Sequence, residues 1–274
     1  MEYIDRVNRI VSYINERTTV FAPEFGIILG TGLGALTEKI VVEKEIDYKD
    51  IPEFPVSTVA GHEGKLIFGT LSGRKVVAMK GRFHFYEGYP MTDVTLPVRV
   101  MKKLGAHTLV VSNACGGLNP NFKPGDIMII TDHINFMGTN PLIGPNLDEF
   151  GPRFPDMSSV YDKEAKKIIQ RIAMEKGFTV QEGVYTAVSG PNYASKAELT
   201  MLIIMGSDAI GMSTVPEAIV AKHSGMKVIG ISCITDMAIP DASMTPPDHQ
   251  EILKVAEGVK EKFTLLVEKL IQEV

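Results

Sequence analysis

The 274-residue sequence has little of several features that mark particular classes of protein. Its two cysteines, Cys115 and Cys233, lack the spacing of a zinc site or a disulfide framework, so we expect a reducing cytoplasm. No apolar run reaches the roughly 18 residues of a membrane span, and the first residues do not resemble a signal peptide. The net charge is −5 and no block of Lys and Arg occurs, which argues against nucleic-acid binding through a basic face.

The composition and the order of elements predict one globular α/β domain. Apolar residues make up 45% of the chain and charged residues 22%, which is enough apolar material for a sizeable core. Strand-like and helix-like segments alternate throughout, without repeats or an obvious linker. We therefore expect a single domain over residues 1–274, built on a mixed, mostly parallel β-sheet flanked by helices.

Hydrophobic periodicity predicts the individual elements. Helices are expected at residues 4–16, 94–104, 162–176, 195–205, 215–224 and 247–273. Strands are expected at residues 26–29, 65–71, 75–80, 108–111, 126–131, 183–188, 208–212 and 227–235, the second and third as a hairpin. Residues 132–161 hold four prolines and read as a long irregular segment, which is usually functional or a contact surface.

Unusual residues follow five of these strands, at the positions where each strand ends. The five loops are residues 30–34, 81–90, 112–119, 189–193 and 212–217. In α/β sheets, ligands bind at the carboxyl ends of the strands. Five such loops therefore predict a single ligand site at one edge of the sheet.

The loop at residues 30–34, Gly-Thr-Gly-Leu-Gly, allows three interpretations. It matches the loose dinucleotide fingerprint G-x-G-x-x-[G/A], but no long helix and second apolar strand ending in an acid follow it. It could also be a plain structural turn. We favour a phosphate cradle, in which glycine N–H groups point inward and Thr31 adds a hydroxyl.

Other loop residues supply donors suited to the same oxyanion. Arg82 binds planar oxyanions well, and His84 can donate a hydrogen bond or carry charge near neutral pH. Ala114 lies in a run of small residues where the backbone can approach a ligand closely. Ser213 precedes a predicted helix, so it is either an anion-binding hydroxyl or a plain N-cap.

Six separated motifs, in register from about residue 4 to the final helix, resemble those of the trimeric purine nucleoside phosphorylases. They are Gly30-Thr31-Gly32-Leu33-Gly34, Gly61-His62-Glu63-Gly64, Gly81-Arg82-Phe83-His84-Phe85-Tyr86-Glu87-Gly88-Tyr89-Pro90, Ser112-Asn113-Ala114-Cys115-Gly116-Gly117-Leu118-Asn119-Pro120, Asp132-His133-Ile134-Asn135 and Gly211-Met212-Ser213-Thr214-Val215-Pro216-Glu217. The resemblance implies phosphorolysis of purine (2′-deoxy)ribonucleosides to free purine and (deoxy)ribose 1-phosphate.

The resemblance also implies roles for individual residues. The phosphate positions match Thr31, Arg82, His84, the Ala114 backbone and Ser213, with His62 nearby. The ribose positions match Tyr86, Met212 and His249. Phe150 matches an aromatic that closes the ribose pocket of a neighbouring subunit, which implies a homotrimer and gives residues 132–161 the purpose of a subunit contact.

The base-binding positions depart from the members of the family that prefer inosine and guanosine. Those members carry Glu after the aromatic of a Gly-Pro-x-[Phe/Tyr] motif, where this chain has Tyr193 followed by Ala194. They carry Asn where this chain has Asp236 after Ile-Thr, and the related methylthioadenosine phosphorylases also have Asp there. A carboxylate accepts hydrogen bonds from a 6-amino group and repels a 6-oxo group unless it is protonated. We therefore expect a shift toward adenosine or methylthioadenosine, with Asp236 also able to act as a general acid at purine N7.

This chemistry needs neither a metal nor a cofactor, since the six histidines show no metal-ligand spacing and phosphate itself is the co-substrate. The sequence also allows other functions. The chain could be a methylthioadenosine phosphorylase, a nucleosidase, a nucleoside-binding protein or an NAD-binding enzyme. Phosphate dependence of base release distinguishes a phosphorylase from a nucleosidase. Titration with a nicotinamide nucleotide tests whether the chain binds NAD.

Overall fold

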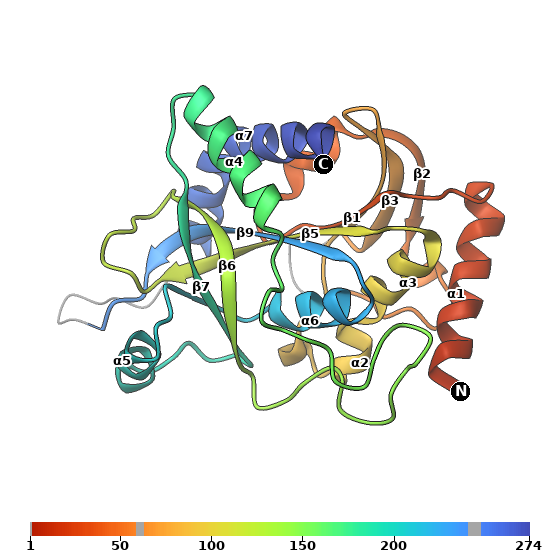
Figure 1. Ribbon diagram of the computed structural model, residues 1–274, viewed down its shortest axis with the longest axis horizontal. Helices are drawn as coiled ribbons and strands as arrows, with labels where there is room; N and C mark the ends of the chain where they lie inside the picture. The colour runs from red at the N-terminus through yellow and green to blue at the C-terminus, as the bar shows by residue number, and fades with distance from the viewer. Residues whose placement is uncertain (1, 59–62, 241–247) are drawn as a thin grey trace.

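The structure, a computed structural model, describes residues 2–58, 63–240 and 248–274 (Figure 1). The α-helices are α1 (Glu2–Thr18), α2 (Met91–Val94), α3 (Leu96–Leu104), α4 (Lys163–Glu175), α5 (Lys196–Ile204), α6 (Val215–His223) and α7 (His249–Glu273). Short 3₁₀-helices are η1 (Gly34–Lys39), η2 (Tyr48–Asp50) and η3 (Phe85–Glu87). The strands are β1 (Phe25–Ile28), β2 (Val41–Asp47), β3 (Lys65–Leu71), β4 (Arg74–Lys80), β5 (Thr108–Gly117), β6 (Ile127–Phe136), β7 (Gln181–Val188), β8 (Ala209–Gly211) and β9 (Lys227–Met237).

The strands form one mixed sheet in the order β2-β3-β4-β1-β5-β8-β7-β6-β9. Five of the nine strand pairings are parallel (β1–β4, β1–β5, β5–β9, β6–β7 and β7–β8), which confirms the expected mostly parallel sheet. β5 also pairs with β9, so β5, β8, β7, β6 and β9 close into a ring. The sequence analysis did not predict this closure. Bulges in β9 and β6, each an extra residue that bends its strand, accompany the closure.

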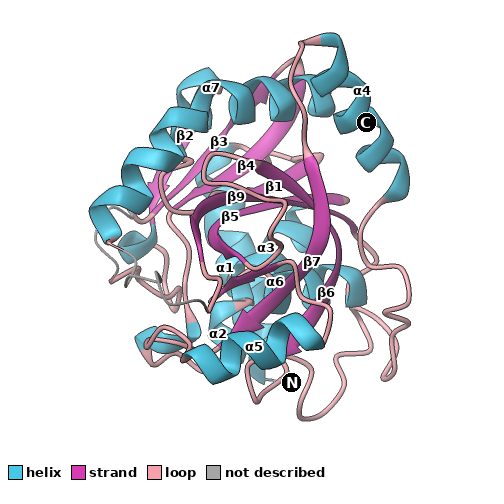
Figure 2. Ribbon diagram, turned by 90° about the vertical axis from the view of Figure 1, so that its left-hand side faces the viewer, coloured by secondary structure: helices cyan, strands magenta, loops and turns pink. Residues whose placement is uncertain are grey.

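Helices cover both faces of the sheet (Figures 1 and 2). α4 and α7 pack on one face through a core that includes Ile169, Phe263 and Leu266. α1, α3 and α6 pack on the other, through residues such as Ile10 and Val98. Both faces are apolar because the central strands carry buried side chains on each side, as a covered sheet requires. Among the described residues, none of the helices is both long and apolar enough to cross a bilayer.

Most expected elements shift by only one or two residues at their ends, and three segments depart further from the prediction for a local reason. The helix expected at residues 94–104 is interrupted at Thr95, because Pro97 has no N–H to donate to the carbonyl four residues earlier. The loop expected at residues 112–119 is strand up to Gly117, since pairing with β8 and β9 continues that far. The irregular segment begins later than residue 132, because β6 pairs with β7 as far as Phe136.

Candidate active site

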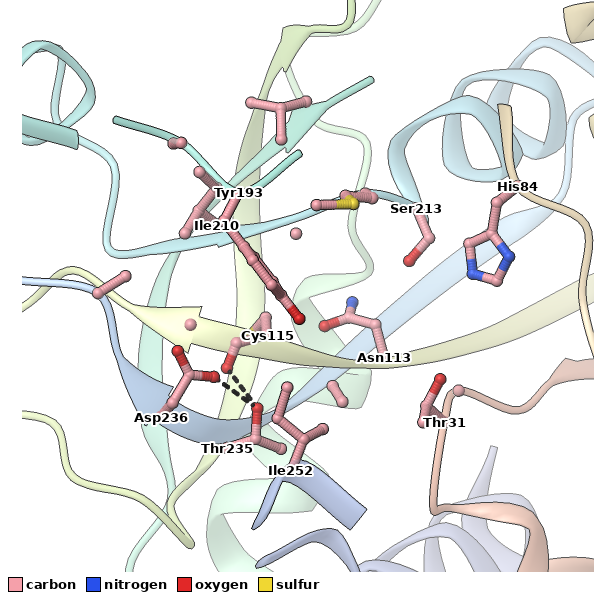
Figure 3. Close-up of a pocket in the computed structure, with 18 of the residues that line it drawn as sticks. Thr31, His84, Asn113, Cys115, Tyr193, Ile210, Ser213, Thr235, Asp236 and Ile252 are labelled. Carbon is pink, nitrogen blue, oxygen red and sulfur yellow. Dashed lines mark hydrogen bonds between the residues drawn. The ribbon is translucent and has the colours of Figure 1, made fainter. Parts of the chain in front are cut away.

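A cavity of about 200 Å³ lies where β1, β4, β5, β8 and β9 deliver their carboxyl ends. Ten of the site residues expected from the sequence line it: Thr31, Arg82, His84, Tyr86, Ala114, Tyr193, Ala194, Met212, Ser213 and Asp236. The residues come from all five predicted loops and from the end of β9, so the structure brings them together around one cavity. Figure 3 shows Thr31, His84 and Ser213 at one side of the cavity and Asp236 at the other.

Three expected residues are not placed in this cavity. His62 lies outside the described residues, as does the side chain of His249. Phe150 is buried elsewhere, with its ring centroid 4.7 Å from the Arg99 guanidinium. Because its expected role is in a neighbouring subunit's site, the position of Phe150 within one chain leaves that role a prediction.

The loop at residues 30–34 approaches the end of β5 very closely. A Cβ on Gly30 would lie 2.5 Å from the Cα of Asn113, so only glycine fits at this crossing. The close approach brings Thr31 to the cavity beside Asn113. The residues that follow form the short 3₁₀-helix η1 and then β2, so the long helix of a dinucleotide site does not follow this loop.

Arg82 is held by a buried acid that the sequence reading missed. Glu217 Oε1 lies 2.5 Å from Arg82 Nη2 and 3.1 Å from Nε, and both side chains are almost fully buried. Arg82 Nη1 also donates to the Ser112 carbonyl at 2.6 Å. A buried charge needs a partner, and this one fixes the guanidinium plane as well as neutralising it. Arg82 therefore offers a rigid, oriented donor surface to an anion.

His84 is oriented by Glu87 of the same loop. Glu87 Oε1 accepts from the His84 backbone N–H at 2.8 Å and lies 3.1 Å from His84 Nδ1. Its other oxygen accepts from the N–H and hydroxyl of Thr58, at 2.9 and 2.6 Å. Burial alone would raise the pKa of Glu87, but these four hydrogen bonds outweigh it and lower the pKa to about 2. Burial lowers the pKa of His84, with Glu87 opposing it. When Nδ1–H donates to Glu87, Nε2 donates to an oxyanion if the imidazole is protonated and accepts a hydrogen bond if it is neutral.

Glu87→Gln is expected to flatten the acid side of the stability curve. The carboxylate has a lower pKa in the folded chain, so its stabilisation is present above the unfolded pKa of about 4.5 and is lost as pH falls toward 2. Over that window we expect the unfolding free energy of the variant to fall less than that of the wild type, by on the order of 1–3 kcal/mol. Urea unfolding at several pH values measures it. Glu251→Gln, at an exposed acid, is the control, and equal slopes for wild type and Glu87→Gln would contradict the assignment.

Ser213 is followed by a strained residue. Thr214 has φ of +71°, which is an outlier for a β-branched residue, and it is completely buried. Asn113 Nδ2 donates to Thr214 Oγ1 at 2.9 Å and ties this turn to β5. The turn sets Ser213 at the cavity two residues before the first residue of α6, near the helix N-terminus, where backbone N–H groups favour an anion. Thr214, not Ser213, is the N-cap residue of α6, so the interpretation of Ser213 as a plain N-cap is wrong, and its anion-binding role stays a prediction.

The carboxyl group of Asp236 lies at the opposite end of the cavity. Burial raises its pKa, while a hydrogen bond from the Thr235 hydroxyl at 2.9 Å lowers it in part. Tyr193 projects toward the middle of the cavity, and Ala194 adds only a methyl group (Figure 3). In the part of the chain that the structure describes, Asp236 is therefore the one acid of the cavity lining, and its burial favours the neutral form of the carboxyl group.

Sequence reasoning missed Glu217, Glu87, Thr214, Asn113 and Thr235. Four of them stand inside the motifs quoted above, yet nothing in a linear sequence says that Glu217 meets Arg82 from 135 positions away. Thr235 directly precedes Asp236, and adjacency to an acid at a strand end is the signal that could have found it. Among the described residues, no group of three or more His, Cys, Asp or Glu is arranged to hold a metal ion.

Comparisons with known proteins give one consistent result. The family model of the Phosphorylase superfamily matches residues 24–272. Purine nucleoside phosphorylase 1 of Bacillus subtilis is 55% identical over 269 residues, which cover 98% of each chain. The Schistosoma mansoni purine nucleoside phosphorylase, solved in complex with adenosine, is 45% identical with a TM-score of 0.94, covering 99% of this chain and 98% of its own. Its complex with inosine gives a TM-score of 0.92 at 44% identity, covering 99% and 97%.

Proposed function

The chain belongs to the Phosphorylase superfamily, among its purine nucleoside phosphorylases, and from that premise we propose how its own residues carry out and select the reaction. Its activity is phosphorolysis of purine nucleosides: phosphate attacks C1′ of the pentose and displaces the free purine. The glycosidic bond breaks as the bond from phosphate oxygen to C1′ forms. Its electron pair leaves on the purine.

We propose that Thr31, Arg82, His84, Ser213 and the Ala114 backbone bind the attacking phosphate, with His62 nearby. The support is that all except His62 are placed around one cavity, and that Glu217 and Glu87 hold two of the donors in fixed orientations. Fixed donors position the nucleophile without reorganisation during the reaction. Phosphate beside C1′ also stabilises the positive charge that develops on the sugar. We propose that the reaction needs no cofactor beyond this co-substrate.

The phosphate requirement tests the reaction type. Purified enzyme freed of phosphate is expected to release base only at the background rate, and added phosphate should restore release with one pentose 1-phosphate formed per purine. Base release at the full rate without phosphate would instead identify a nucleosidase.

The sugar is proposed to lie between the phosphate and the base, against Tyr86 and Met212. The Tyr86 ring stacks on His84, with centroids 4.7 Å apart and an interplanar angle of 15°. Tyr86 and Met212 both lie against Gly190, because a Cβ added to Gly190 would be 2.4 Å from Met212 Sδ and 3.2 Å from the Tyr86 ring. His249, which begins α7, is the third ribose contact that we propose.

We propose that 6-aminopurine nucleosides, adenosine foremost, are the preferred substrates. The observation that carries this is that, of the described residues, Asp236 is the one carboxyl group in the cavity lining, with Ala194 where an acid could have stood. The carbonyl oxygen of a neutral Asp236 accepts from the 6-amino group, and its O–H donates to N7. Adenine has no N1–H, so it does not need the acceptor that Ala194 fails to supply.

The preference is one of degree within this family. The Schistosoma mansoni enzyme forms complexes with adenosine, inosine and guanosine. The relatives compared above are named purine nucleoside phosphorylases, which favours nucleosides with a 5′-hydroxyl over methylthioadenosine. The double variant Ala194→Glu with Asp236→Asn is expected to have a higher kcat/KM for inosine than the wild type. No gain with inosine would count against this division of roles.

We also propose a homotrimer in the cytoplasm. The irregular segment after β6 exposes large apolar side chains, with Phe154 88% exposed and Ile143 71% exposed. Phe136, 42% exposed, lies at the end of β6 beside this segment. Large apolar side chains that are exposed along one segment are typical of a contact surface. Phe150 belongs to the same segment, and Arg99 and Lys103 stack on its ring and fix its position. The two unpaired, buried cysteines suit a reducing compartment.

Phe154→Asp is expected to weaken the assembly, since it places a charge in an apolar contact. Sedimentation velocity should show trimer for the wild type and smaller species for the variant at micromolar concentration. Ile204→Asp makes a matched change at an 81% exposed residue on α5, outside the segment, and should leave the trimer intact. A wild-type monomer, or a Phe154→Asp trimer of unchanged stability, would overturn this surface.

A further inference from the structure

Thr235 occupies an irregular position in the strand that carries Asp236. Cys115 of β5 pairs with Ile234 of β9, and Gly116 pairs with Asp236, so Thr235 is an extra residue in the β9 ladder. Its side chain is 4% exposed. Its hydroxyl lies 2.9 Å from Asp236 Oδ1 and 3.2 Å from the Cys115 carbonyl oxygen (Figure 3). Bulges of this kind re-aim side chains next to active sites.

A threonine hydroxyl carries one hydrogen, so it can serve only one of these two acceptors as a donor. The separation of 2.9 Å from Asp236 Oδ1 lies within the usual range for O–H···O bonds, and 3.2 Å to the Cys115 carbonyl does not. The hydroxyl therefore donates to Oδ1. A proton on Oδ1 would face that hydrogen, so the proton of neutral Asp236 belongs on Oδ2. Oδ2 lies over Gly116, where an added Cβ would be only 3.3 Å away, and the absence of a side chain there leaves this oxygen accessible from the cavity.

We propose that Thr235 is a positioning residue that directs the Asp236 proton to the oxygen facing the purine and stabilises the carboxylate left when N7 takes it. This inference rests on the proposed role of Asp236 as general acid. In the step, the Oδ2–H bond breaks and the N7–H bond forms as the C1′–N9 electron pair moves onto the purine. The negative charge left on Asp236 strengthens the hydrogen bond from Thr235 to Oδ1. The hydroxyl thus contributes more in the transition state than in the ground state, which is the condition for accelerating the step.

Two other titratable groups face Asp236 in the described part of the chain. Cys115 on β5 and Tyr193 before α5 are both influenced by the Asp236 charge, and Asp248 at the start of α7 faces Tyr193. Burial raises the pKa of the Cys115 thiol and of the Tyr193 phenol. Both groups stay protonated while Asp236 ionises. The loss of activity at alkaline pH, which Thr235 is expected to shift, is therefore assigned to ionisation of Asp236.

The sign of the pH effect follows from the acid form being the active one. Activity with adenosine is lost as pH rises through the Asp236 pKa, which burial raises and Thr235 lowers. Removing the hydroxyl raises this pKa further, so the alkaline limb of kcat/KM moves to higher pH. At the same time the weaker acid lowers kcat by on the order of 10- to 100-fold, the worth of a hydrogen bond to a charged group.

The test is the pH profile of Thr235→Val with adenosine at saturating phosphate, compared with wild type so that phosphate ionisation is common to both. We expect a lower kcat, a nearly unchanged KM and an alkaline limb displaced upward by about one pH unit. Thr235→Ser should restore both the rate and the limb, because it returns the hydroxyl. Thr235→Ala removes the hydroxyl without added bulk and serves if the valine methyl disturbs packing.

Two results separate the inference from the function beneath it. If Thr235→Val or Thr235→Ala lowers kcat equally at every pH, or if Thr235→Ser fails to restore the limb, Thr235 is structural and the inference is overturned. If Asp236→Asn keeps wild-type activity with adenosine, the acid role of Asp236 itself fails, whatever Thr235 does. A displaced limb in Thr235→Val together with an inactive Asp236→Asn supports both.

Discussion

Replacing Arg82 with alanine is expected to lower kcat/KM for phosphate by on the order of 10²–10³, the loss typical of removing one preorganised charge-stabilising donor. The same change should destabilise the fold, because Glu217 would remain buried without its partner, and the Ser112 carbonyl and Thr214 hydroxyl would lose the Arg82 donor. Breaking a buried pair in this way costs about 3–5 kcal/mol. Initial rates over a range of phosphate concentrations and urea unfolding measure the two losses separately.

A double variant distinguishes the two consequences of this pair. Arg82→Met with Glu217→Gln removes both charges and keeps similar volumes, so it should recover most of the stability lost in Arg82→Ala. It should not recover phosphate binding, because the donors are gone. Full activity in the double variant would mean that the pair only stabilises the fold and that Arg82 does not bind the nucleophile.

Replacing Asp236 with asparagine is expected to reverse the base preference. The amide cannot transfer a proton to N7, and general acid catalysis is typically worth 10²–10⁴-fold, so kcat/KM for adenosine should fall by about 10²-fold or more. The amide N–H can donate to the O6 of a 6-oxopurine, so inosine should lose much less and the ratio of adenosine to inosine should drop. Matched kinetics with both nucleosides at saturating phosphate measure this. An unchanged ratio would remove Asp236 from the selection of the base.

Local patterns predicted much of the fold. The apolar periodicity of Val7, Ile10 and Ile14 placed α1, and the strand–turn–strand pattern placed the β3–β4 hairpin. The closure of β5 against β9 was not predictable, because pairing partners more than a hundred residues apart leave no local trace. The interruption of the helix at Thr95 has a cause that is visible in the sequence, Pro97. The prediction of one continuous helix followed the apolar periodicity and did not take this proline into account.

The sequence could predict which residues line the site, but not which residues contact and orient one another there. Loops at strand ends collect at one edge in an α/β fold, so Arg82, His84 and Ser213 could be assigned to one cavity, while Asp236 was assigned from the family resemblance. The buried acid that orients Arg82 and the bulge that aims Asp236 arise from long-range contacts and from one extra residue in a ladder. These long-range features set the charge and the orientation of the site side chains. The chemistry of the site depends on both, as well as on which residues are present.

The central claim is that a neutral Asp236, without an acid at position 194, makes this chain a purine nucleoside phosphorylase that favours 6-aminopurines. The most direct measurement is kcat/KM of the wild-type enzyme for adenosine and for inosine, each at saturating phosphate and the same pH. The account predicts a higher kcat/KM for adenosine. A value for inosine ten or more times that for adenosine would contradict it.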